Sequence, residues 1–85
     1  MWRGELDREK DSILVQLGAD IDVEREAQGL TVAVFADRAR LSKRGVVYTR
    51  KIQCDPKLST LIAQAKALGR RLSVTLEPNR GERDV

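Results

Sequence analysis

Basic side chains that could bind a polyanion are concentrated in the middle of the 85-residue chain. Between positions 38 and 71, ten Lys and Arg residues stand against the single acidic residue Asp55, a net charge of +9. The first 29 residues carry four basic and eight acidic groups instead, a net charge of −4. Because ammonium and guanidinium groups bind phosphate oxygens, the basic middle predicts a surface that holds a nucleic-acid backbone.

An aromatic side chain lies among these cations. In an extended segment over 46–53, Tyr48 and Arg50 would point to the same face. The ring could stack on an unpaired base while the guanidinium meets a phosphate, a combination that favours single-stranded nucleic acid. The predicted nucleic-acid-binding residues are Arg38, Arg40, Lys43, Arg44, Tyr48, Arg50, Lys51, Arg70 and Arg71.

The acidic first third of the chain supports a second interpretation. Asp20, Asp22 and Glu24 alternate with apolar residues, so a strand would present three carboxylates on one face. These carboxylates could pair with the basic middle of the same chain, of a second copy or of another protein. Under this hypothesis the chain is a protein-interaction or self-assembling accessory module, and a homo-oligomer is as well supported as a nucleic-acid complex.

The sequence contains no histidine and a single cysteine, Cys54. A Ser-His-Asp triad, a Cys-His pair and a zinc site built from His or several Cys residues are therefore excluded within it. The six glycines are isolated from one another and form no phosphate-binding loop. We therefore expect a non-catalytic binding module with no catalytic residue, no metal ligand and no cofactor.

The clearest predicted element is a helix over 56–68. Asp55 is a good N-cap, Pro56 suits the first helical position, and Gly69 is placed to end the helix. Apolar residues recur at helical spacing along one face, namely Leu58, Leu61, Ile62, Ala65 and Leu68.

Alternating apolar and polar residues, many of them β-branched, predict strands in the rest of the chain. The element order β-β-β-β-α-β then indicates an α+β fold, with a curled antiparallel five-stranded sheet or a partly open small barrel. The predicted strands cover residues 2–7, 13–17 with a continuation at 21–23, 30–36, 46–53 and 71–77.

The second half of the chain also resembles a known architecture. A predicted strand at 46–52 leads into the helix, which ends Ala65-Lys66-Ala67-Leu68-Gly69, and a final strand at 70–77 follows. This order resembles the late part of small bacterial OB-fold-like barrel modules, most closely over 55–77. The resemblance implies a partly open barrel and carries no functional signature. The chain departs from the usual pattern in having four predicted strands before the helix instead of three.

The predicted organisation is one small domain over residues 1–78 and a flexible tail over 79–85, where no periodicity is present. No stretch approaches the roughly 18 apolar residues of a membrane span. The first residues also lack an apolar signal region. We therefore expect a cytoplasmic protein without a membrane partner.

Overall fold

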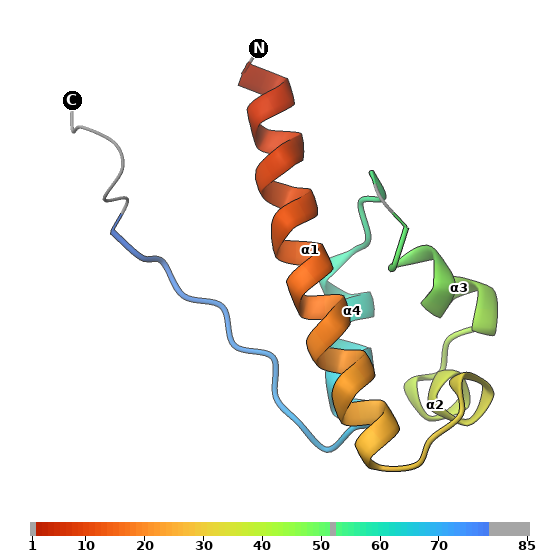
Figure 1. Cartoon of the computed structure of the whole chain (residues 1–85). Coiled ribbons are helices and arrows are strands. Elements are labelled where there is room, and N and C mark those ends of the chain that lie inside the picture. Colours follow the sequence, from red (N-terminus) through yellow and green to blue (C-terminus); the bar gives the residue numbers. More distant parts are fainter. Residues whose placement is uncertain (1, 52, 79–85) are drawn as a thin grey trace.

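The computed structural model describes residues 2–51 and 53–78. Figure 1 shows a long rod, α1, with three shorter helices gathered beside its C-terminal half and an extended segment that follows the last of them. The predicted tail at 79–85 lies outside the described residues. The helices are α1 (Trp2–Ala27), α2 (Val32–Ala39), α3 (Lys43–Tyr48) and α4 (Leu58–Ala67).

The predicted α+β fold is wrong, because the described residues form helices and contain no strand. The expected strands at 2–7 and 13–17 both belong to α1, as does the expected continuation at 21–23. The segments expected as strands at 30–36 and 46–53 overlap α2 and the end of α3 instead. The OB-fold-like resemblance is wrong for the same reason, since a barrel is built from paired strands.

The burial pattern of α1 explains why it is a helix. Leu14 and Leu17 are half-buried and Ile21 is buried, and their spacing of three and four residues places them on one helical face. Ile13 and Val15, which suggested a strand, are 66% and 63% exposed. The apolar residues therefore follow the helical period once Leu14, and not Ile13, is taken as facing inward.

The start of α2 is fixed by a side-chain cap. The hydroxyl oxygen of Thr31 accepts a hydrogen bond from the backbone N–H of Val34 at 3.2 Å. The buried residues that follow, Phe35, Ala36 and Ala39, again have helical spacing. A β-branched alternation around these positions predicted a strand, but the cap and the buried face together favour the helix.

The predicted helix at 56–68 is confirmed as α4, which spans Leu58–Ala67. It begins two residues later than expected, with Lys57 in the N-cap position in place of Asp55 and no side-chain cap. Gly69 ends it as predicted, with the positive φ of +72° that glycine adopts without strain. Its buried side includes the polar Gln64.

A small apolar core joins the helices. The Phe35 side chain is fully buried at its centre, and parts of all four helical regions contribute to the cluster around it. Burying such side chains is the main stabilising contribution available to a chain of this size. The cluster consists of Ile21, Phe35, Ala36, Val46 and Leu68.

The C-terminal ends of α1 and α4 are tied together by polar contacts. The Gln28 amide nitrogen donates to Glu24 Oε2 at 2.9 Å and to the Leu68 carbonyl at 2.9 Å. Arg70 Nη2 forms an ion pair with Glu24 Oε1 at 3.2 Å. The hydrogen bond from Gln28 and the nearby charge of Arg70 together hold the pKa of Glu24 below its usual value.

These contacts predict that part of the stability of the folded chain is lost in acid. Because the pKa of Glu24 is lower in the folded chain than in the unfolded chain, its contribution to stability is present above the usual value of 4.5 and is lost as the pH falls through the folded value. Glu24→Gln and Gln28→Ala should both make the thermal midpoint less dependent on pH in this acid range. Circular dichroism melts measure that dependence, and an unchanged slope in both variants would contradict the assignment.

Candidate nucleic-acid interface

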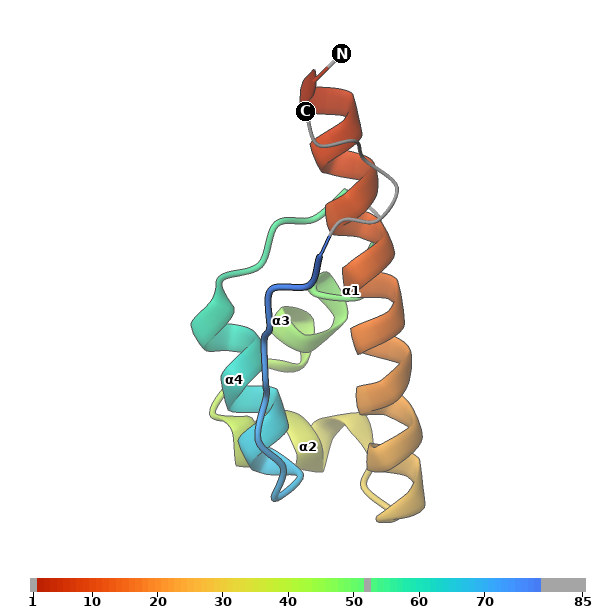
Figure 2. The same ribbon diagram turned by 90° about the vertical axis from the view of Figure 1, so that its left-hand side faces the viewer.

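The helices α2 and α3 form a pair joined by three residues, 40–42. Figure 1 shows α2 nearly end-on and α3 above it from the side, whereas Figure 2 shows α2 from the side. Their axes therefore cross steeply. Two helices joined by a short turn at a steep angle make up the helix-turn-helix arrangement.

The turn between the two helices is held at both ends. Arg40 adopts the left-handed conformation that ends α2, with φ 59° and ψ 41°. Leu41 follows and packs against the core. Ser42 then caps α3, because its hydroxyl oxygen accepts the backbone N–H of Gly45 at 2.9 Å. This combination fixes the direction in which α3 leaves α2.

One face of α3 points to solvent. Lys43, Arg44, Val47 and Tyr48 are exposed, whereas Val46 is buried in the core. Pairs of helical residues four apart lie on the same side, so the four exposed residues form a continuous strip. The strip carries two cations in the first turn of α3 and an apolar side chain in the second.

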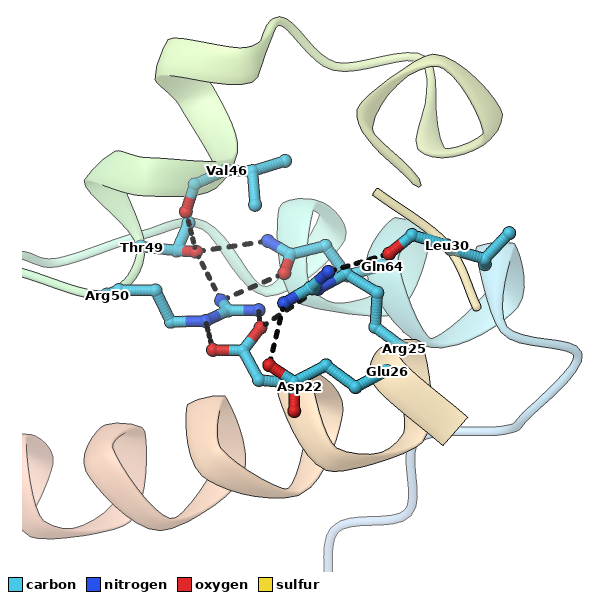
Figure 3. Close-up of polar contacts among 8 residues, drawn as sticks. All are labelled: Asp22, Arg25, Glu26, Leu30, Val46, Thr49, Arg50 and Gln64. Atoms are coloured by element: carbon cyan, nitrogen blue, oxygen red, sulfur yellow. Dashed lines mark hydrogen bonds and ion pairs between the residues drawn. The ribbon is translucent and has the colours of Figure 1, made fainter. Parts of the chain in front are cut away.

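The C-terminal end of α3 is anchored by Arg50. Figure 3 shows its guanidinium group between α1 and α4. Arg50 Nε and Nη2 donate to the two carboxylate oxygens of Asp22 on α1, both at 3.1 Å. Arg50 Nη1 donates to Thr49 Oγ1 at 2.7 Å and to Gln64 Oε1 at 3.0 Å. A two-pronged pair of this kind fixes direction as well as distance.

Two buried polar side chains complete this network. Thr49 is 4% exposed and Gln64 is fully buried. The Thr49 hydroxyl donates to the Val46 carbonyl at 2.7 Å and accepts from the Gln64 amide nitrogen at 3.2 Å. Since buried polar groups are costly without partners, these bonds allow Gln64 to lie inside the fold. The network joins α1, the end of α3 and α4, and so holds the exposed strip in place.

The structure separates the predicted binding residues into two groups. Arg50 points inward to Asp22, and Arg70 pairs with Glu24. Tyr48 is 45% exposed, and its hydroxyl accepts the backbone N–H of Asp55 at 3.3 Å. The residues that are exposed and form no ion pair with another described residue are Arg38, Arg40, Lys43, Arg44, Lys51 and Arg71.

Four of these exposed cations follow one another along the helix pair. We call Arg38, Arg40, Lys43 and Arg44 the turn patch, since they cover the end of α2, the turn and the start of α3. Asp37 is the only acidic residue between positions 27 and 54, so the patch is strongly positive. Lys51 follows α3 closely, whereas Arg71 belongs to the extended segment.

Sequence patterning missed two residues of this surface. The alternation over 46–53 predicts a strand at Val47, whereas in the structure Val47 is 46% exposed on the outer strip of α3. Ser42 is the N-cap of α3, and a serine just before a helical segment is the sequence signal that could have located this helix.

Comparisons of the chain with protein-family models, curated proteins and solved structures found no match. Among the helices described here, none combines the length and apolar character required to cross a membrane.

The ends of the helices predict an effect of Arg40 on stability. The left-handed residues that end α1 and α4 are glycines, at 29 and 69, but Arg40 occupies the same position after α2. Because a side chain disfavours this conformation, Arg40→Gly should raise the unfolding free energy by about 0.5–1 kcal/mol. Arg40→Ala is the matched control, since it removes the same charge but keeps a Cβ. Urea denaturation compares them, and a glycine variant less stable than the alanine variant would refute the argument.

The approach of α1 to Arg50 predicts a second effect. A Cβ at Gly18 would lie 2.9 Å from Arg50 Cδ, whereas a Cβ at Gly4, also in α1, would meet no atom within 4 Å. Alanine normally stabilises a helix relative to glycine by roughly 0.5–1 kcal/mol. We expect Gly4→Ala to be neutral or stabilising, and Gly18→Ala to lose about 1–3 kcal/mol because the Arg50 network must shift. Equal melting midpoints for the two variants would contradict this prediction, because they would mean that the Arg50 side chain can move away from a Cβ at position 18 without loss of stability.

Proposed function

We propose that the chain binds duplex DNA, with α3 as the helix that enters the major groove. The observation that carries this proposal is the pairing of a short turn with an exposed, basic first turn of α3. In helix-turn-helix proteins the second helix lies in the major groove and its N-terminal residues contact base edges. Lys43 and Arg44 occupy these positions in α3.

The chemistry of the turn patch fits the parts of such a complex. The guanidinium of Arg44 can donate two hydrogen bonds to the O6 and N7 atoms of a guanine, and Val47 can contact a thymine methyl group. Arg38 and Arg40 precede α3 and are suited to phosphate oxygens, which set orientation and supply affinity. The described residues thus offer both base-reading and backbone-binding groups.

Duplex DNA is favoured over single-stranded nucleic acid and over duplex RNA. Base stacking requires a free aromatic platform, but the hydroxyl of Tyr48 is engaged by Asp55 and its ring is half-exposed. Arg50, expected to bind phosphate beside Tyr48, is instead bonded to Asp22. The major groove of RNA is too narrow for a helix.

A protein-interaction role remains the second candidate function. It is favoured by the exposed apolar side chains of α1, Leu6, Ile13 and Val15, which lie outside the turn patch. Such residues are common singly on surfaces, so they support this role less directly than the turn patch supports DNA binding.

Fluorescence anisotropy with labelled duplex DNA, single-stranded DNA and duplex RNA, over a salt series, tests the proposal. We expect duplex DNA to bind most tightly, with affinity that falls steeply as salt rises. The Lys43→Ala/Arg44→Ala variant should bind duplex DNA about tenfold or more weakly. Its salt dependence should change little, because the salt slope counts phosphate contacts and these two residues are assigned to base edges.

Lys66→Ala/Lys57→Ala is the matched control, because both lysines are exposed and it removes two positive charges outside α3. Its affinity should stay closer to that of the parent chain. Absence of binding to duplex DNA at low salt, or equal losses in the two double variants, would sink the proposal that α3 is the contacting helix.

A further inference from the structure

The segment that follows α4, residues 71–78, has no regular secondary structure and runs in an extended path. Residues 71–78 make no backbone hydrogen bond with any other described residue. Figure 1 shows the segment on the side of α1 opposite the α2–α3 pair, and Figure 2 shows it passing in front of α4 along the outside of the molecule. Unpaired N–H and C=O groups in a row form a template on which another strand can pair.

The side chains of this segment alternate in character. Leu72, Val74 and Leu76 occupy every second position, so in extended backbone they share one face. Leu72 lines a hollow with Leu17 and Leu68, at the edge of the core. Val74 and Leu76 continue the same face but are 76% and 101% exposed. The segment therefore presents an apolar face that the rest of the described chain leaves uncovered.

The sequence of the segment is complementary to itself when reversed. If two copies run antiparallel about Val74, Leu72 of one lies opposite Leu76 of the other, and Ser73 lies opposite Thr75. In the same register Arg71 lies opposite Glu77, at both ends of the pairing. Opposite charges, apolar pairs and hydroxyl pairs across strands are each stabilising.

Other arrangements lose this match. A parallel, in-register pairing would place Arg71 opposite Arg71 and Glu77 opposite Glu77, and like charges directly opposite each other are destabilising. Centring the antiparallel pair on Ser73 would place Arg71 opposite Thr75 and leave Glu77 without its partner. The antiparallel register about Val74 is the one that satisfies both charged residues.

We propose that two copies of the chain pair through residues 71–77 as a two-stranded antiparallel ribbon whose two-fold axis passes beside Val74. Each copy contributes the same surface, as a symmetric dimer requires. The ribbon brings Leu76 of the second copy next to Leu72 and the hollow at the edge of the core. The pairing leaves the turn patch uncovered by the segment and does not depend on DNA binding, so it is tested without nucleic acid.

Sedimentation equilibrium of the full 85-residue chain over a wide concentration range measures the association. We expect a species of twice the 9.5 kDa chain mass to dominate at high concentration. Arg71→Glu turns two attractive pairs per dimer into two repulsive ones, and should weaken dimerisation about tenfold at low salt. Glu77→Arg should have the same effect, and the Arg71→Glu/Glu77→Arg variant should restore the parent affinity.

Lys66→Glu is the control for the charge change, since it alters net charge by the same amount at an exposed position of α4. It should leave the dimer affinity unchanged. A chain that stays monomeric at every concentration would overturn the proposal. A dimer whose affinity is the same in the parent, Arg71→Glu and Glu77→Arg chains would also overturn it, because that dimer would use another surface.

Cross-linking tests the register directly. Val74→Cys places two thiols opposite each other across the two-fold axis, so mild oxidation should give a covalent dimer. Ser73→Cys faces Thr75 of the second copy and should cross-link far less. The parent chain, in which Cys54 is buried, is the control and shows how much cross-linking occurs without an added thiol. Cross-linking of Ser73→Cys as fast as Val74→Cys would contradict the register.

Discussion

The position of α3 depends on one guanidinium group. Arg50 follows α3 in the chain, and its fork meets Asp22 on α1 while its remaining nitrogen meets Thr49 and Gln64. The ion pair is only partly buried, since 20% of the Arg50 side chain and 40% of the Asp22 side chain are exposed. It therefore fixes the orientation of the guanidinium group more than it adds Coulomb energy. A helix of six residues is marginal on its own in water, so α3 depends on its tertiary contacts, which are the buried Val46 and the Arg50 network. The two hydrogen bonds from Arg50 to Asp22 therefore add a directional contact to the packing of Val46.

Helix α4 could be predicted from the sequence because its apolar stripe and its terminal glycine agree with each other. Strands were wrongly predicted in the first half of the chain, because Ile13, Val15, Val32 and Val34 are β-branched and fall at alternate positions. These four residues lie on helices, where tertiary packing of their neighbours overrides local preference. Helical spacing was present in the same stretches, but choosing between the two periods requires knowing which residues are buried.

The candidate site was predictable as a charge excess but not as a surface. Composition alone located the basic middle, and the turn patch lies within it. It did not separate Arg44, which is exposed, from Arg50, which completes a network inside the fold. The difference arises from Asp22, which is 28 residues away in the chain and becomes a neighbour only through the path of α1. Likewise, the pattern at 71–77 suggested a strand, and the structure leaves that segment extended but unpaired.

The length of α1 has a consequence for how stability is distributed. The molecule measures 47 × 22 × 19 Å, and its long dimension is set by the helix, whose first turns extend beyond the bundle. Around Ile21 the helix is held by the core, whereas residues 4–9 are exposed on every side. An unsupported helical stretch of that length is marginal in water. The two ends of α1 therefore have different opening energies: the N-terminal turns can fray and re-form while the C-terminal half stays closed until the whole bundle unfolds.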